Sequence, residues 1–218
     1  MRMSLKQNYP PSLLILVSIN IITIFGIIFL NWKTPEIIIA FWAESAIIGF
    51  FVILKMIKTK SIAPEKVKNV FPVKIKYLLV PFFIFHYGIF MLAHLAFIFV
   101  MFNIGETEIV LAEIIPTVAI IFASLFISHL FSYRSNFIEN KEYEKSSVIK
   151  IMFSPYKRIL TMHFAIILGF IIYIFLIPIS GGSPIEKISA IILTIIKILA
   201  DSFSHLKESK LMPFGQLR

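Results

Sequence analysis

The sequence predicts an all-α membrane protein, a polytopic bundle of six transmembrane helices with both termini in the cytoplasm. Three observations lead to this class. Of the 218 residues, 58% are hydrophobic, whereas a soluble domain is about 45–50% apolar. The apolar residues gather in six runs, each close to the roughly 20 residues that a helix needs to cross a bilayer. Lys and Arg lie almost entirely on one side of these runs.

The six runs are joined by short loops, so we expect a single integral membrane domain over residues 1–218. No cleavable signal peptide is expected, because the first run is long enough to span and no small-residue cleavage site follows it. No internal repeat is apparent. The predicted spans are approximately 12–32, 35–56, 78–102, 109–131, 159–179 and 184–206.

Aromatic residues typical of membrane interfaces stand at several of these ends. Trp32 closes the first run at the outer boundary, and Tyr77, Tyr133 and Tyr156 lie at the inner boundary beside the third, fourth and fifth runs. The segment 146–156 mixes apolar and basic residues, and we expect it to lie along the inner surface.

The basic residues predict the orientation. The chain has 21 Lys and Arg and a net charge of +9. Only Lys33 and Lys187 fall in the outer loops, and Lys197 lies within the sixth run. The positive-inside rule therefore places both termini in the cytoplasm, in a multi-pass protein of the cell membrane. The charge excess is a topology signal and requires no nucleic acid, so the predicted partner is the lipid bilayer, with a homo-oligomer possible and protein partners unknown.

Titratable side chains inside the runs are the strongest functional signal, because such groups are costly at membrane depth and usually line a packed interior or a wet cavity. Glu44 lies nine positions into its run, roughly 14 Å below the outer boundary. By the same count His86 and Lys197 are near the midplane, His163 is in the inner leaflet and His94 is in the outer half.

Four of these groups suggest a metal site. Asp201 and His205 are spaced i, i+4 on one helix face, His163 lies at comparable depth, and His86 is a fourth candidate from above. Nitrogen and oxygen ligands of this kind suit Zn²⁺, Fe²⁺ or Mn²⁺. The first hypothesis is therefore a metal-dependent membrane enzyme acting on a lipid-like substrate.

In that enzyme Glu44 would be the general base on a metal-bound water, and His94 would orient the substrate. The second hypothesis is a proton-coupled transporter or proton relay, with Glu44, His86, His94 and Lys197 along a polar path and no metal required. Whether the chain is an enzyme stays open at this point.

A b-type haem protein with His86 and His163 as axial ligands is a third hypothesis. The fourth is a structural membrane subunit, in which Lys197 and Asp201 form only an i, i+4 ion pair. The chain has no cysteine, which excludes disulfides, thiolate metal ligands and iron–sulfur clusters. Phosphate-binding glycine loops and the Gly-x-Ser-x-Gly nucleophile motif are also missing.

Four motifs give a resemblance to a known family. They are Phe-Trp-Ala-Glu-Ser-Ala-Ile-Ile-Gly-Phe-Phe at 41–51, Phe-Phe-Ile-Phe-His-Tyr-Gly-Ile-Phe at 82–90 followed by His94, Tyr-Lys-Arg-Ile-Leu-Thr-Met-His at 156–163, and Lys-Ile-Leu-Ala-Asp-Ser-Phe-Ser-His at 197–205. Together they resemble a prokaryotic family of polytopic membrane proteins described as a domain of unknown function, with intramembrane Glu, His and Asp motifs. The resemblance covers the second to sixth runs and implies no particular activity.

Overall fold

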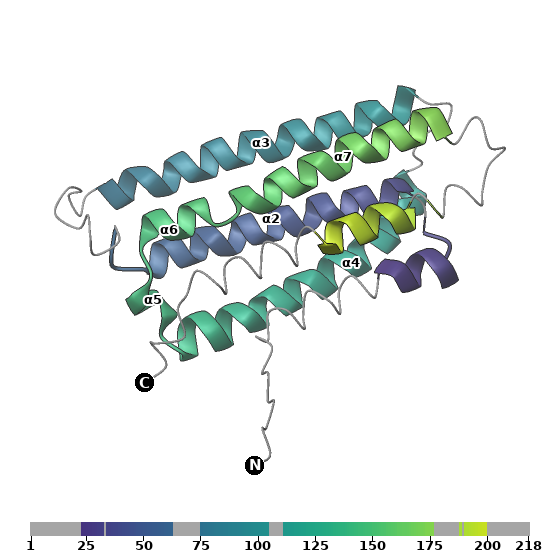
Figure 1. Ribbon diagram of the computed structural model, residues 1–218. Helices are drawn as coiled ribbons and strands as arrows, with labels where there is room; N and C mark the ends of the chain where they lie inside the picture. Colours follow the sequence, from purple (N-terminus) through teal and green to yellow (C-terminus); the bar gives the residue numbers. More distant parts are fainter. Residues whose placement is uncertain are drawn as a thin grey trace, which may run out of the picture.

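The computed structural model describes residues 23–32, 34–62, 75–104, 111–176, 188 and 190–199. These residues are helical, apart from turns and one isolated parallel bridge between Ser61 and Ser147. The long helices, which run side by side in Figure 1, are α2 (Thr34–Lys58), α3 (Lys76–Ile104), α4 (Leu111–Ser132) and α7 (Tyr156–Leu176). The short elements are η3 (Tyr133–Glu139), α5 (Glu142–Lys145) and α6 (Val148–Phe153). Residues 23–29 and Ala190–Leu199 are also helical.

Each of the four middle predicted spans coincides with a long helix, and residues 23–29 of the first span and 190–199 of the last are helical too. Within the described residues, three helices are long and apolar enough to cross a membrane, namely Thr34–Lys58, Lys76–Val100 and Ile114–Glu139. The all-helical class and the presence of apolar, membrane-length helices are therefore confirmed.

Helix α2 is the centre of the bundle. Pro35 and Glu36 stand in its first turn and Lys55 and Lys58 in its last, which matches the preference for proline at a helix start and complements the helix dipole. It contacts α3, α4, α6 and α7. In its most apolar stretch 67% of the residues are buried, against 28% in α3 and 17% in α4. The outer helices thus present apolar side chains outward, as lipid-facing helices do, while α2 is enclosed by protein.

The contact between α2 and α3 combines hydrogen bonds with close approach. The Tyr87 hydroxyl donates to the Ser45 carbonyl oxygen at 2.6 Å, and Trp42 Nε1 donates to the Met91 carbonyl oxygen at 2.8 Å. At Gly49 an added Cβ would collide with the ring of Tyr87. A glycine is required here because the aromatic ring occupies the space of a side chain, and these contacts fix the register of the two helices.

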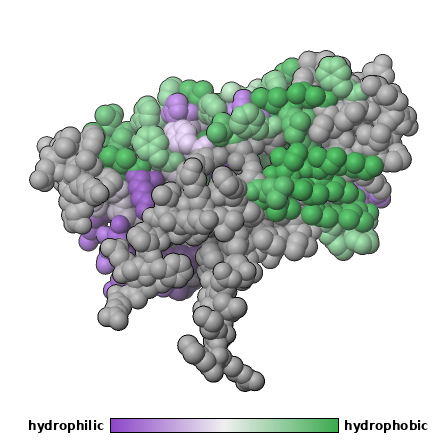
Figure 2. Space-filling model, in the orientation of Figure 1, coloured by the Kyte–Doolittle hydropathy of each residue, from purple (hydrophilic) through white to green (hydrophobic). Residues whose placement is uncertain are grey.

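One end of the bundle is basic and aromatic. Lys55 Nζ lies 5.3 Å from the centre of the Phe137 ring, and Lys58 Nζ lies 5.3 Å from that of Tyr143. Figure 2 shows hydrophilic side chains near this end, where α5 lies, and a broad hydrophobic surface toward the other end. The described lysines of α2, α3 and α6 that we expected on the cytoplasmic side therefore share one end of the bundle.

The segment 146–156 packs against α2. Its helix α6 buries Val148, Ile151 and Met152 in the same hydrophobic cluster as α2 and α3. The Val148 amide donates to the Ser61 carbonyl oxygen at 2.9 Å, so α6 is attached to the chain that leaves α2. In Figure 1, α6 continues the direction of α7 with a turn between them. The sequence predicts this segment at the inner surface, but half of its short helix belongs to the core.

Candidate functional site

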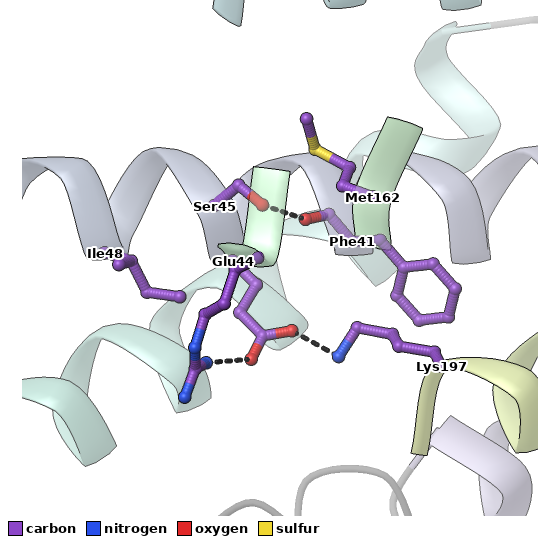
Figure 3. A pocket seen from close by; sticks show the side chains of 7 residues that line it. Phe41, Glu44, Ser45, Ile48, Met162 and Lys197 are labelled. Carbon is purple, nitrogen blue, oxygen red and sulfur yellow. Dashed lines mark hydrogen bonds and ion pairs between the residues drawn. The ribbon is translucent and has the colours of Figure 1, made fainter. Parts of the chain in front are cut away.

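The carboxylate of Glu44 lies in the interior of the bundle, at the middle of α2, with only 7% of the residue exposed. Its Oε2 atom accepts from Lys197 Nζ at 2.7 Å. Lys197 belongs to helix Ala190–Leu199, which reaches the same depth as Glu44 (Figure 3). The side chains of both residues are 9% exposed. A charge-assisted hydrogen bond of this length, shielded from solvent, is strong.

Arg158 supplies a second cation from α7. Its Nη1 atom lies 3.5 Å from Glu44 Oε1, and its side chain is 30% exposed. This contact is longer and more exposed than that of Lys197, so it contributes less to stability. One carboxylate thus contacts two cations, and the three charged groups come from three helices that are distant in the sequence. His129 of α4 is also within electrostatic reach of Glu44 and stacks on Phe51.

A small cavity adjoins these charges. Its volume is about 10 Å³, at the lower limit for a single water molecule. The Lys197 ammonium also lies 4.9 Å from the centre of the Phe41 ring, a cation–π contact that holds it beside the cavity. The lining residues are Phe41, Glu44, Ser45, Ile48, Arg158, Met162 and Lys197. In this conformation the site has room for water or a proton but not for a whole organic molecule.

A second polar contact joins α3 and α7. His94 Nε2 and His163 Nδ1 are 2.9 Å apart, and the rings meet edge to face with centroids 5.1 Å apart. His94 is buried, with 7% exposed, whereas His163 is exposed on α7. The pair therefore connects the interior of the bundle to its outer face.

The hydrogen bonds define the proton positions of this pair. His94 Nδ1 is 2.8 Å from the Phe90 carbonyl oxygen, which can only accept, so His94 Nδ1 carries a hydrogen. In the neutral pair His94 Nε2 therefore accepts from His163 Nδ1, and His163 Nε2 is left as an acceptor or metal ligand. One additional proton can be placed on either ring without breaking the contact.

The remaining predicted site residues lie elsewhere. His86 is exposed on α3, stacks on Phe82 with ring centroids 5.5 Å apart, and lies 6.1 Å from the ring of Tyr156. Asp201 and His205 lie outside the described residues. Among the residues that the structure describes, no group of three or more His, Asp or Glu is arranged to hold a metal. The four-ligand site stays a prediction.

Two expectations about depth have different outcomes. The sequence predicts Glu44 and Lys197 at one depth, and their 2.7 Å contact agrees. It predicts His94 and His163 in opposite leaflets, which is wrong because their rings touch. The sequence count takes Ile159 as the inner end of the helix. In the structure α6 extends the bundle beyond the start of α7, so His163 lies further from that end than the count gives.

Arg158 is a member of the site that the sequence does not predict, because it stands just outside the fifth predicted span, 159–179. The available signal was its position directly before the fifth apolar run, where a long arginine side chain can extend along the helix. Its position in the sequence suggested only a role in topology, while the structure brings it to the buried carboxylate.

No curated protein and no solved structure matches the chain. A family profile does match, and it covers residues 2–213, nearly the whole sequence. The match includes both Glu44 with its two cations and the His94–His163 pair. The chain belongs to the family of unknown function DUF6498.

Proposed function

We propose that this protein is a proton-linked membrane transporter or proton relay in which Glu44 takes up and releases the proton. The observation that carries the proposal is the Glu44 carboxylate, enclosed in the most buried helix and in contact with Lys197 and Arg158 beside a water-sized cavity. Lys197 is the internal counter-ion that compensates the carboxylate when the proton has left.

The cost of the arrangement supports a functional role. Removing two charges from water costs several kcal/mol per ion, and apolar residues of similar size often give equal or greater stability. Ionisable groups inside membrane bundles are accordingly rare and mark ion and proton pathways. A purely structural contact between these helices would be served by apolar side chains such as those of α2 and α3.

The position of Arg158 supports access from one side. It lies in the first turn of α7, near the basic end of the bundle, and about a third of its side chain is exposed. Arg158 is therefore a partly exposed contact of the otherwise buried Glu44, on the side of α6 and the basic end. The His94–His163 pair, which bridges interior and outer face, is a second group able to pass a proton.

We extend the proposal to topology and origin. The protein crosses the cell membrane six times, has both termini in the cytoplasm, and places the basic end toward the cytoplasm. The intramembrane Glu, His and Asp motifs are features of a prokaryotic family. These statements are supported by the asymmetry of Lys and Arg in the sequence and by the gathering of the described lysines at one end.

The test is proton movement in proteoliposomes that contain a trapped pH-sensitive dye, with the membrane potential clamped by potassium and valinomycin. We expect the protein to dissipate an imposed pH gradient, and Glu44→Gln to slow this to the rate of protein-free vesicles. Glu36→Gln is the matched control, because Glu36 is also a buried carboxylate of α2, and we expect the wild-type rate.

Infrared difference spectra complement the flux assay, because a protonated carboxyl in an apolar site has its own C=O band. Acidification of the wild-type protein is expected to produce a band that Glu44→Gln removes and Glu36→Gln keeps. Equal proton flux in wild-type and Glu44→Gln vesicles, together with unchanged spectra, would refute the proposed function.

A metal-dependent enzyme is the second candidate, and one observation favours it. His163 Nδ1 is occupied by His94, the arrangement in which an outer partner orients a metal-binding imidazole and leaves its other nitrogen for the metal. His163 Nε2 would then bind Zn²⁺, Fe²⁺ or Mn²⁺ with Asp201 and His205. Stoichiometric metal in the purified protein, lost in His163→Ala, would support this candidate, and a Soret band would instead indicate haem.

A further inference from the structure

We infer that the cargo of the Glu44 site is a carboxylate anion, which enters together with the proton and replaces the Glu44 carboxylate between Arg158 and Lys197. The inference rests on the proposed proton-linked function and specifies its substrate class. It starts from the three charged groups and from what protonation of one of them does to the other two.

Protonation of Glu44 removes the negative charge that Lys197 and Arg158 share. The ammonium keeps its cation–π contact with Phe41, so it stays beside the cavity. Protonation thus raises the net charge of the three groups by one unit in the interior of the bundle, which is unfavourable at low dielectric. A monovalent anion entering with the proton restores the earlier charge of the three groups, so joint binding of one proton and one anion is electrically neutral.

The chemistry of the two cations selects the anion. The guanidinium of Arg158 has a planar fork of N–H donors that matches a carboxylate, and Glu44 Oε1 engages only Nη1, at 3.5 Å. The site already binds a carboxylate of the protein itself, in a geometry that uses one cation on each oxygen. A carboxylate of the cargo can take the same two positions once Glu44 is neutral and turns away.

The residues around Glu44 indicate the route by which the cargo carboxylate would reach the site. The groups that face Glu44 among the described residues are Lys197, Arg158 and His129, from three different helices, and α3 contributes Tyr87 nearby through its bond to Ser45. Arg158 is the most exposed of the cations, and the basic end beyond it raises the local concentration of anions. The cavity of about 10 Å³ admits a carboxylate group only if Glu44 moves.

The test is equilibrium binding of radiolabelled acetate and decanoate to the full chain in an uncharged maltoside detergent. Binding in detergent avoids the passive passage of weak acids through vesicle membranes. The two probes distinguish a small soluble acid from a fatty acid. At pH above the ionisation of Glu44 we expect affinity to fall about tenfold per pH unit, because one proton is bound with each anion. Glu44→Gln should bind at all pH values without this slope.

Lys197→Met and Arg158→Met should both lose binding, and Glu36→Gln should behave as the wild type. Size-exclusion profiles of each variant separate loss of binding from loss of folding. Glu44→Gln is expected to keep binding, so it tests the site without removing a cation. Two results would overturn the inference. One is binding to Glu44→Gln with the same pH slope as in the wild type, and the other is no binding of either acid to the wild type and to Glu44→Gln.

The outcomes also separate the two proposals. Proton flux that requires Glu44, without binding of either acid, leaves the proton-linked function standing and overturns the carboxylate cargo. Carboxylate binding that requires Lys197 and Arg158, without any Glu44-dependent proton movement, supports the anion site and refutes the transport function.

Discussion

The two polar contacts inside this bundle differ in charge and in enclosure. Glu44 and Lys197 are ionised partners, each with a side chain 9% exposed. His94 and His163 are joined by a single hydrogen bond between rings, and one of the rings is exposed. The first contact connects α2 with the helix Ala190–Leu199, and the second connects α3 with α7.

This difference teaches how the bundle distributes its polar groups. The buried carboxylate lies in the most enclosed helix, where a direct cationic partner must be present, while the histidine pair lies where one ring can face the outside. Removing one member should therefore be far more harmful at the Glu44 site than at the histidine pair. The following predictions begin with the largest effect.

Lys197→Met should lower the free energy of unfolding by about 3 kcal/mol, because it leaves a buried carboxylate with only the longer contact to Arg158. Arg158→Met should cost about 1 kcal/mol or less, since its side chain is partly solvated. The double variant Glu44→Leu with Lys197→Met should recover most of the loss. Steric trapping in bicelles measures all three, and an equal cost for Lys197→Met and Arg158→Met would contradict the ranking.

Gly49→Ala should lower the unfolding free energy by about 1–3 kcal/mol, because the methyl group collides with the ring of Tyr87. This change disturbs the α2–α3 contact that holds the helix of His94 against the helix of Glu44. Gly88→Ala is the matched control on α3, where an added Cβ meets nothing within 4 Å, and it should be neutral or stabilise by up to about 1 kcal/mol. Comparable losses in the two variants would refute the steric explanation.

His94→Leu and His163→Leu should show a coupling of about 1 kcal/mol in a double-mutant cycle, the size of one hydrogen bond. The cycle for Glu44 and Lys197 should give a larger value, because both charges are buried. Unfolding in the same bicelles measures the two cycles side by side. A histidine coupling as large as the ion-pair coupling would overturn the comparison between the two sites.

Ser45→Ala should change the unfolding free energy by about 0.5 kcal/mol or less. The Ser45 hydroxyl donates to the Phe41 carbonyl oxygen one turn earlier at 3.2 Å, a local bond that does little for a helix. Ser124→Ala on α4 removes the equivalent bond to Ile120 and serves as its control. A large loss at Ser45 alone would show that its hydroxyl is needed at the charged cavity.

The helices could be predicted from the sequence, because hydrophobic runs of bilayer length have few alternatives. The spans predicted at 35–56 and 78–102 correspond to Thr34–Lys58 and Lys76–Ile104, a difference of about two residues at most ends. Depth along a single helix is also predictable, because each residue adds a fixed rise. Counting residues from the span boundaries therefore places Glu44 and Lys197 at one level, but it misplaces His163, because the boundary of the fifth span leaves out α6.

Partners across helices were harder to predict. Periodicity gives the face of a residue on its own helix, but it does not give the rotation of one helix against another. The predicted metal and haem sites therefore group His163 with His86, whereas the structure pairs it with His94. Arg158 was missed for a related reason, since a hydropathy boundary marks where the backbone enters the membrane and says nothing about the reach of a long side chain.

The hydrogen bond from Trp42 to the Met91 carbonyl also makes the α2–α3 contact visible to spectroscopy. The chain has two tryptophans, Trp32 and Trp42, so Trp32→Phe leaves a single indole whose N–H crosses from one helix to the other at 2.8 Å. Its fluorescence reports whether these helices are in contact, without an added label. Intrinsic emission can therefore follow the separation of α2 and α3 in real time.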